Sequence, residues 1–265
     1  MNILVLELRR SFRSWLYFTL SLVAVFGIFS AFFNSFKMDA ALINDLLQNF
    51  PQEFKAAFGF ADVNLSKIEG YLSFIFSYLI LIGAVFAMKQ GLSLLSEEGR
   101  RHMSDFLLTK PIRRREVVAA KFTAVLIQLL MQNLVLFCGG RATIIWLIRE
   151  DMDGRLYFLM CLSVLLVQLF FVGIGMLIAT AAPKIKSVMP LTLGTVFFFF
   201  IIELLNESIQ DQKLAYLTPF AYYQGSDLIS RRGYDPGFLV LNLAVFAVLT
   251  SLSFWIYQKR DFYAG

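Results

Sequence analysis

Six long apolar runs, separated by polar segments, extend along the whole chain. Each run carries few charged residues and has the length of about 20 residues that a helix needs to cross a bilayer. They predict an all-α, polytopic membrane protein with six transmembrane helices, at residues 15–33, 71–95, 122–148, 156–182, 187–205 and 236–258. No polar segment is long enough for a soluble domain, so we expect residues 1–265 to form a single transmembrane domain.

Residues 1–14, which precede the first run, have their apolar side chains at helical spacing. Leu4, Leu8 and Phe12 recur every four residues, while basic residues occupy other faces. This pattern predicts an amphipathic helix that lies at the cytoplasmic interface and leads into the first span. A plain basic anchor ahead of the span is the alternative, and the sequence favours neither.

Composition supports the membrane interpretation, because 58% of the residues are hydrophobic and only 16% are charged. Soluble domains carry closer to a quarter charged residues. The net charge of +5 lies in short loops, which argues against a nucleic-acid-binding protein and calls for the positive-inside rule. One side of the expected topology receives 15 of the 24 Lys and Arg residues, and the other side receives 8. We therefore expect both termini in the cytoplasm.

No residue pattern typical of an enzyme stands out in the sequence. His102 is the single histidine, and Cys138 and Cys161 lie inside apolar runs, where they act as small apolar residues. The sequence has no HExxH, no GxSxG and no phosphate-binding GxxxxGK[ST] motif. We therefore expect no catalytic residue, no metal site and no cofactor in this chain.

Two charged residues and two glycines inside the apolar runs are not typical of lipid-facing helices. Arg141 lies about two-thirds along the third run and Glu203 near the end of the fifth. Charged side chains are costly in lipid and usually face a cavity, a partner or the interface. Both are expected toward the external side, either as a structural ion pair or on the outer part of a translocation path. In the fourth run, Gly173 and Gly175 predict close approach of a neighbouring helix.

The most charged part of the chain, residues 97–121, lies between the second and third runs. In its middle it has an apolar patch, Phe106, Leu107 and Leu108, followed by the helix-breaking Pro111. An apolar patch on a cytoplasmic loop needs a cover. The cover is either the bilayer surface, with the segment serving as a basic topology signal that binds lipid headgroups, or another protein.

This segment resembles the cytoplasmic signature of the type-two ATP-binding-cassette (ABC) permease family. The signature has two acids, then Gly-Thr-Leu-Glu, Leu-Leu-Ser-x-Pro, Ser-Arg and a Lys. The matching residues are Glu97, Glu98, Asp105, Leu107, Leu108, Thr109 in place of Ser, Pro111, Arg113 or Arg114, and Lys121. The sequence departs from the signature at the Gly-Thr pair, where it has His102 and Met103. Residues 216–223 resemble a second family segment, Leu-Ser/Thr-Pro-Phe-x-Tyr-Phe.

The resemblance implies a non-catalytic membrane subunit of an ABC exporter. In that family a separate ATPase subunit, which binds ATP and Mg²⁺, docks from the cytoplasm, and two permease copies or two related permeases pair in the membrane. A short helix at residues 104–108 would then insert into a cleft of the ATPase. The residues implied in this coupling are Glu97, Glu98, Asp105, Phe106, Leu107, Leu108, Pro111, Arg113 and Arg114.

On the external side, the resemblance implies re-entrant helices within residues 206–235 that cap the exit. Pro219, Phe220, Tyr222 and Tyr223 would form an outer gate. The cargo is left open among peptides, drugs, lipids and ions, with a slight preference for export of an amphipathic peptide or drug. The sequence DFLLTKP resembles that of bacterial members of the family, and this implies that the chain lies in a bacterial cell membrane. A membrane scaffold or assembly factor that docks an ATPase without transporting cargo is the alternative function.

Overall fold

The computed structural model describes most of the chain as helices. Described are residues 3–39, 49, 51, 64–100, 114–182, 185–209 and 212–259, with the backbone alone for residues 3, 95–100, 114, 115 and 212. The helices are α1 (Ile3–Ala31), α2 (Phe33–Met38), α5 (Ile68–Arg100), α7 (Arg114–Thr143), η1 (Ile144–Ile148), α8 (Gly154–Ala181), α9 (Val188–Ile209), α10 (Gln212–Ala215), η2 (Ala221–Tyr223), α11 (Gly225–Arg231) and α12 (Pro236–Lys259). No strand occurs among the described residues, and the prediction of an all-α protein is confirmed.

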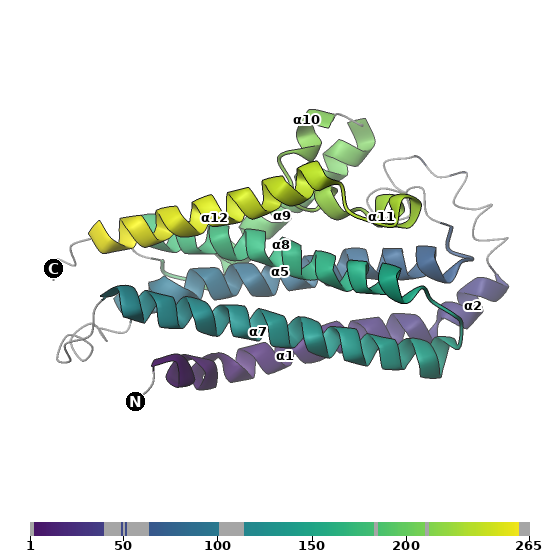
Figure 1. The fold of residues 1–265 in the computed structure, drawn as a ribbon, viewed down its shortest axis with the longest axis horizontal. Coiled ribbons are helices and arrows are strands. Elements are labelled where there is room, and N and C mark those ends of the chain that lie inside the picture. Colours follow the sequence, from purple (N-terminus) through teal and green to yellow (C-terminus); the bar gives the residue numbers. More distant parts are fainter. Residues whose placement is uncertain are drawn as a thin grey trace.

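Six of the helical stretches are long and apolar enough to cross a membrane. They are α1 with α2, α5, α7 with η1, α8, α9 and α12. This confirms the six spans expected from the apolar runs. Figure 1 shows them side by side in an elongated bundle, with the start of α1, the end of α5, the start of α7 and the end of α12 together. We call this the N/C end; the opposite end, where α2 and α11 lie, is the loop end.

The first span is continuous with the helix expected in residues 1–14. α1 is one helix from Ile3 to Ala31, without a boundary near residue 14. The physical reason is that nothing there interrupts a helix, since the first glycine is Gly27 and the first proline is Pro51. A location of the first turns at the membrane interface stays a prediction.

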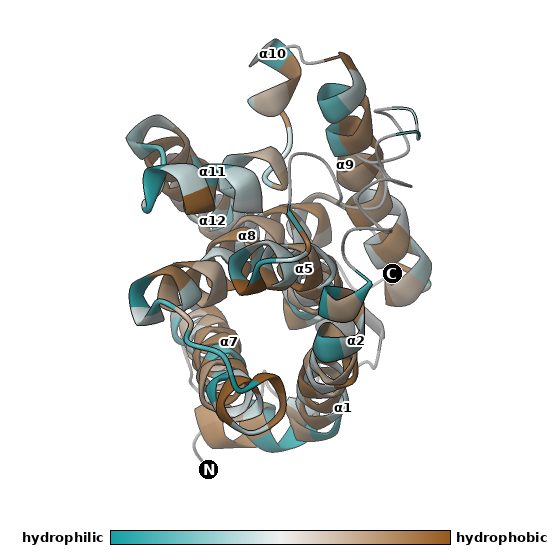
Figure 2. Ribbon diagram, turned by 90° about the vertical axis from the view of Figure 1, so that its right-hand side faces the viewer, coloured by the Kyte–Doolittle hydropathy of each residue, from teal (hydrophilic) through white to brown (hydrophobic). Residues whose placement is uncertain are grey.

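The helices α5 and α8 form the centre of the bundle. Of the most apolar 18-residue window of each span, 78% is buried in α5 and 67% in α8, against 17–33% in the other four. Figure 2 shows α5 and α8 in the middle, with α1 and α7 on one side, α12 on another and α9 on a third. α9 packs against α5, and α12 packs against α8. The core of the protein is therefore the contact between two helices far apart in the sequence.

Two glycines allow the central helices to touch through their backbones. A Cβ at Gly91 would lie 2.6 Å from the carbonyl oxygen of Val172, and one at Gly175 would lie 2.8 Å from that of Met88. A side chain at either position would therefore push α5 and α8 apart. Gly173, on another face of α8, approaches α12, where a Cβ would lie 3.2 Å from a side chain. The close approach of neighbouring helices predicted for Gly173 and Gly175 is confirmed.

Candidate functional site

The segment that resembles the coupling motif lies mostly outside the described residues. Asp105, Phe106, Leu107, Leu108, Pro111 and Arg113 are not described, and Glu97, Glu98 and Arg114 are described by their backbone alone. Their role in coupling stays a prediction. The structure describes the two helices on either side: α5 continues without interruption to Arg100, and α7 begins at Arg114, both at the N/C end (Figure 1). In the chain, the segment therefore follows directly on the most buried helix.

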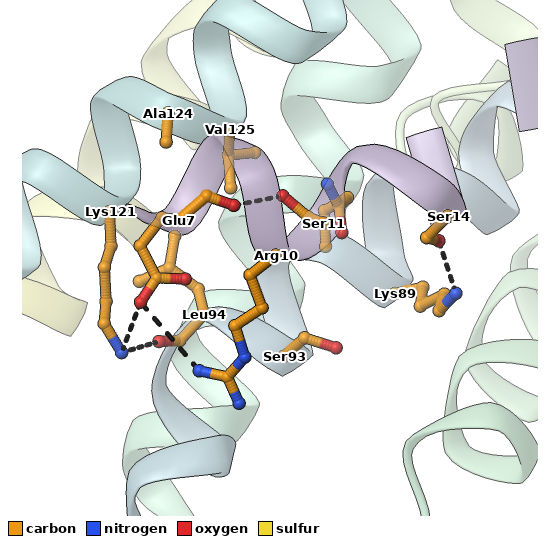
Figure 3. Close-up of a pocket in the computed structure, with 11 residues that line it drawn as sticks. Glu7, Arg10, Ser11, Ser14, Lys89, Ser93, Leu94, Lys121, Ala124 and Val125 are labelled. Atoms are coloured by element: carbon orange, nitrogen blue, oxygen red, sulfur yellow. Dashed lines mark hydrogen bonds and ion pairs between the residues drawn. The ribbon is translucent and has the colours of Figure 1, made fainter. Parts of the chain in front are cut away.

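A polar cavity of about 150 Å³ lies between α1, α5 and α7 near the N/C end (Figure 3). In it the carboxylate of Glu7 lies between two cations, 3.7 Å from Lys121 Nζ and 4.0 Å from an Arg10 nitrogen. Lys121 Nζ also donates to the Leu94 carbonyl oxygen at 3.1 Å, and its side chain is 5% exposed. A lysine buried to this extent requires such partners, because its charge is otherwise costly. The interaction joins all three helices.

Two buried glutamines extend this polar region into the bundle. Gln128 of α7 donates to the Ser11 hydroxyl at 2.6 Å, and its side-chain oxygen accepts a hydrogen bond from Gln90 of α5. The indole of Trp15 donates to the Gln128 carbonyl oxygen at 2.9 Å. Side-chain hydrogen bonds of this kind hold helices together where the surroundings are apolar. Here they hold α1, α5 and α7 at one level.

A second group of buried amides joins α7 to α8 at greater depth. Gln168 Nε2 donates to Gln132 Oε1 at 2.8 Å, and Asn133 Nδ2 donates to Gln168 Oε1 at 2.7 Å. Gln168 is fully buried and Gln132 is 1% exposed. Reading the sequence missed these amides because they are uncharged. The available signal was the spacing of Gln128 and Gln132, four residues apart and so on one helix face.

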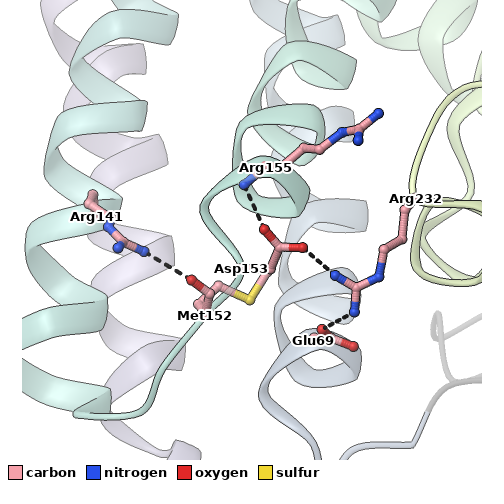
Figure 4. Close-up of polar contacts among 6 residues, drawn as sticks. All are labelled: Glu69, Arg141, Met152, Asp153, Arg155 and Arg232. Atoms are coloured by element: carbon pink, nitrogen blue, oxygen red, sulfur yellow. Dashed lines mark hydrogen bonds and ion pairs between the residues drawn. The ribbon is translucent and has the colours of Figure 1, made fainter.

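The two ionisable residues predicted for the outer path have different partners in the described part of the chain. An Arg141 nitrogen lies 3.4 Å from the Met152 carbonyl oxygen, beyond the end of its own helix (Figure 4). Glu203 is 6% exposed and accepts a hydrogen bond of 2.7 Å from Gln224 Nε2, which also lies 3.4 Å from Glu207. Glu203 therefore joins α9 to the segment before α11.

The four residues predicted to form an outer gate are close together in the structure. Tyr222 and Tyr223 are buried in η2, Pro219 is buried just before it, and Phe220 is half-buried. Tyr222 donates to the Tyr216 carbonyl oxygen at 2.6 Å, and its ring stacks on an α12 phenylalanine with 5.1 Å between centroids. Burial raises the pKa of Tyr222 to about 12, so its hydroxyl stays a neutral donor at physiological pH. Whether these residues gate an exit stays a prediction.

Three further contacts fix this segment to the spans. The Tyr223 hydroxyl accepts a hydrogen bond of 2.8 Å from Asn242 of α12, and Asn242 also donates to the Leu166 carbonyl oxygen of α8 at 2.9 Å. The Thr218 hydroxyl donates to the Phe199 carbonyl oxygen of α9 at 3.0 Å. The Tyr234 hydroxyl donates to the Leu159 carbonyl oxygen of α8 at 2.5 Å, so the segment between α9 and α12 makes hydrogen bonds to three different helices.

At the loop end an arginine joins three elements. Arg232, just after α11, makes ion pairs with Asp153 at the start of α8 and, at 3.4 Å, with Glu69 in the first turn of α5 (Figure 4). Asp153 also accepts a hydrogen bond of 2.9 Å from the Arg155 backbone N–H, and so caps α8. The segment between α9 and α12, which we call the cap segment, is thereby tied to both central helices.

The fold and these contacts define the class of protein. Six helices able to cross a membrane, of which four surround a central pair, make this a multi-pass membrane protein. Within the described residues, no group of three or more His, Cys, Asp or Glu side chains is placed to hold a metal ion.

Residues 1–262 match the family model described as ABC-2 family transporter protein, so the chain belongs to this family. The resemblance found in the sequence is confirmed. Membership makes the chain a permease subunit of an ABC transporter, a type of subunit that is typically non-catalytic and works with an ABC ATPase subunit. Among curated proteins, no sequence matches this chain significantly.

Proposed function

We propose that this chain is the permease of an ABC exporter, driven by an ATPase subunit that docks at the N/C end. The observation that carries the proposal is the continuity of α5. The helix starts at the loop end, forms the most buried span and reaches Arg100, within residues 97–121 that resemble the coupling motif of the family. In this proposal ATP and Mg²⁺ bind to the partner, and the chain lies in a bacterial cell membrane with both termini in the cytoplasm.

The packing supports a route for the motion. A displacement of residues 101–113 by the ATPase would tilt α5, whose backbone is in contact with α8 at Gly91 and Gly175. α8 in turn packs against α12, and Asp153, which caps the start of α8, pairs with Arg232 of the cap segment. A tilt of the central pair would therefore reach the cap segment without unfolding of any helix in between.

In the same proposal the cap segment is the outer gate, in its closed arrangement. Pro219 and both η2 tyrosines are buried, and hydrogen bonds to α8, α9 and α12 hold the segment in place. Opening would separate α9 from this segment and expose Glu203, which now bonds to Gln224. Arg141 and Glu203 would then contact cargo on the outer part of the path.

An amphipathic cargo, such as a peptide, a drug or a lipid, suits the exposed surface. The outward faces of α9 and α12 carry large apolar side chains, among them Phe198, Ile201, Val240, Val248 and Trp255. Such faces suit lipid tails and a second permease copy, with which the chain would pair. We slightly prefer a peptide or a drug as the cargo, because the sequence of the coupling segment resembles bacterial members of the family.

The test is recovery of the ATPase with this chain from its native membranes in mild detergent. We expect a stoichiometric ATPase with the wild type and with Phe106→Leu, which keeps an apolar side chain. We expect its loss with Phe106→Asp and with Leu107→Asp. An ATPase retained by both acidic variants would show that the coupling assignment is wrong.

Hydrolysis measurements separate the exporter from a scaffold. In the reconstituted complex, an exporter should hydrolyse ATP faster when its cargo is added, and the acidic variants should lose this stimulation. An ATPase that binds but shows no stimulation across amphipathic peptides, drugs and lipids would favour the membrane scaffold.

A further inference from the structure

Two arginines lie on the outward face of the first turns of α1. Arg9 and Arg13 are one helical turn apart, and both side chains are exposed. Within the described part of the chain neither makes an ion pair or a hydrogen bond, whereas Arg10, on the inward side, pairs with Glu7. α1 packs with its other faces against α7 and α5 and lies at the outer edge of the bundle (Figure 2). The two arginines therefore face whatever surrounds the protein.

The same face carries large apolar side chains on both sides of the arginines. Val5, Leu6 and Phe12 are all exposed. A rotation of about 100° per residue places Arg9 and Arg13 in the middle of the face and Phe12 and Leu6 at its two edges. Such a mixed face suits neither water, which would meet the apolar side chains, nor hydrocarbon, in which a charged side chain is costly. It suits the headgroup layer of a bilayer, which accommodates both.

The uncharged stretch that follows places the arginines at the depth of the headgroups. No charged residue occurs between Arg13 and Lys37, and these 23 residues measure about 35 Å as a helix. The hydrocarbon core is about 30 Å thick and takes up nearly all of this stretch. Arg13 therefore lies at the boundary of the hydrocarbon, and Arg9 lies about 6 Å further out. At the other end of the stretch, Lys37 is paired with Glu150.

Toward the loop end, the same face of α1 becomes purely apolar. Leu16 and Leu20 continue the line of Arg9 and Arg13, with Tyr17 beside them, and all three apolar side chains are exposed. A phospholipid presents the same order, with a charged phosphate above acyl chains. Guanidinium groups are the preferred partners of phosphate oxygens, because their planar set of N–H donors can bind two oxygens at once. The face thus matches an anionic phospholipid in both charge and order.

We propose that the outward face of α1 binds an anionic phospholipid of the adjoining leaflet. Its phosphate lies between Arg9 and Arg13, and its acyl chains lie along Leu16 and Leu20. A lipid fits this face better than a protein partner outside the membrane does, because the face continues without interruption into the depth of the hydrocarbon. The site goes beyond the proposed export function, since it depends on neither a cargo nor an ATPase.

The inward side of the same turns connects the lipid site to the rest of the bundle. Ser11 accepts a hydrogen bond from the Gln128 side chain of α7, and Trp15 donates to the Gln128 carbonyl oxygen. A lipid bound on the outward side would therefore hold the start of α1 against α7, the helix that follows residues 101–113 in the chain.

The test measures lipid binding to the purified full-length chain by native mass spectrometry, with phosphatidylglycerol and phosphatidylcholine as probes. We expect phosphatidylglycerol to bind more tightly. Arg9→Gln and Arg13→Gln should each weaken its binding about five-fold, the share of one cation near an anionic surface. Both side chains are exposed, so the melting temperature without added lipid should not change. Lys186→Gln, which removes an exposed cation in the turn between α8 and α9, should leave phosphatidylglycerol binding unchanged.

A photoreactive phosphatidylglycerol locates the site independently of any variant. With the reactive group on an acyl chain, we expect crosslinks within residues 12–20. Crosslinks confined to other segments, or equal binding of both lipids, would overturn the proposal.

Two further outcomes would also overturn it. If Lys186→Gln weakens binding as much as Arg9→Gln does, the lipid responds to overall charge and not to a site. If Arg9→Gln and Arg13→Gln lose the ATPase from the membrane preparation but bind phosphatidylglycerol like the wild type, the face belongs to the ATPase.

Discussion

The central helices α5 and α8 and the outer helix α9 are all apolar enough to span a membrane, yet they have different neighbours. Most of α5 and α8 is buried in protein, whereas only 22% of the corresponding window of α9 is buried. The central pair carries Gly91 and Gly175 at a backbone contact, while a Cβ at Gly194 of α9 would meet nothing within 4 Å. In lipid, hydrophobicity does not bring helices together, so small residues and polar side chains determine which helices are central.

The largest expected effect comes from breaking the backbone contact of the central pair. Gly91→Leu would place a side chain where a Cβ already lies 2.6 Å from the Val172 carbonyl oxygen, and backbone cannot move aside as a side chain can. Overpacking of a core typically costs about 1–3 kcal/mol, and this site should be at or above the upper end. The yield of monodisperse protein and its melting temperature measure the loss.

The matched control is Gly194→Leu in α9. Open space surrounds that position, so we expect wild-type yield and melting temperature. If both leucine variants behave alike, the glycine contact does not set the central position of α5 and α8.

The next effect concerns the buried amides that join α7 to the central pair. Gln168→Leu would remove the partner of both Gln132 and Asn133 inside the bundle. Leaving a buried polar group unsatisfied costs about 1–3 kcal/mol, so a clear drop in melting temperature is expected. Gln258→Leu, at an exposed position near the end of α12, should cause none. A combined Gln132→Leu and Gln168→Leu variant should recover part of the loss, because fewer buried polar groups are then left unmatched.

A smaller effect is expected where α9 meets the cap segment. Glu203→Leu would remove the hydrogen bond that Gln224 donates to Glu203. A hydrogen bond to a charged group contributes about 1.5–3 kcal/mol at most, and the buried leucine side chain would offset part of its loss. We expect faster protease cleavage between α9 and α12 with a nearly unchanged melting temperature. Glu203→Gln keeps an acceptor oxygen and should be cleaved like the wild type. A fall in melting temperature as large as that of Gln168→Leu would contradict the peripheral role of α9.

The smallest effect should come from the ion pairs of the cap with the central helices. The Arg232 side chain is 55% exposed, and exposed pairs contribute about 0.2–1 kcal/mol and are screened by salt. Arg232→Gln should lower the melting temperature slightly at low salt and not at all at about 1 M salt. Arg155→Gln, at the same end, should show no salt-dependent difference. A loss that persists at high salt would indicate that Arg232 contributes by packing rather than by charge.

The sequence predicted the number of spans but not their order in space. The six apolar runs were sufficient for the spans, because length and composition alone decide whether a helix can cross a bilayer. They could not reveal that α5 and α8 are central, since the runs are similarly apolar. Of the signals that could have shown it, Gly175 was recognised in the sequence and Gly91 was not.

The contacts of the candidate site were harder to predict than its residues. Glu7 and Lys121 belong to helices more than 100 positions apart, and Arg232 pairs with residues from two other segments. Nothing in a single sequence states which distant charges meet. The residues predicted for the outer gate lie close together because they are neighbours in the chain, and they were singled out because they resemble a family segment. The buried amides were missed because they lack charge.

The point where Gly91 touches α8 divides α5 into two unequal arms. With a rise of 1.5 Å per residue, about 13 Å of helix extend from Gly91 to Arg100 and about 35 Å from Gly91 to Ile68. For a rigid helix pivoting at this contact, the far end moves roughly 2.6 times as far as the near end. A displacement of about 2 Å at Arg100 would thus become about 5 Å at Ile68, next to Glu69 and its ion pair with Arg232. If α5 moves as a rigid helix, the two glycines are its pivot, and a small movement at the N/C end becomes a larger one at the loop end.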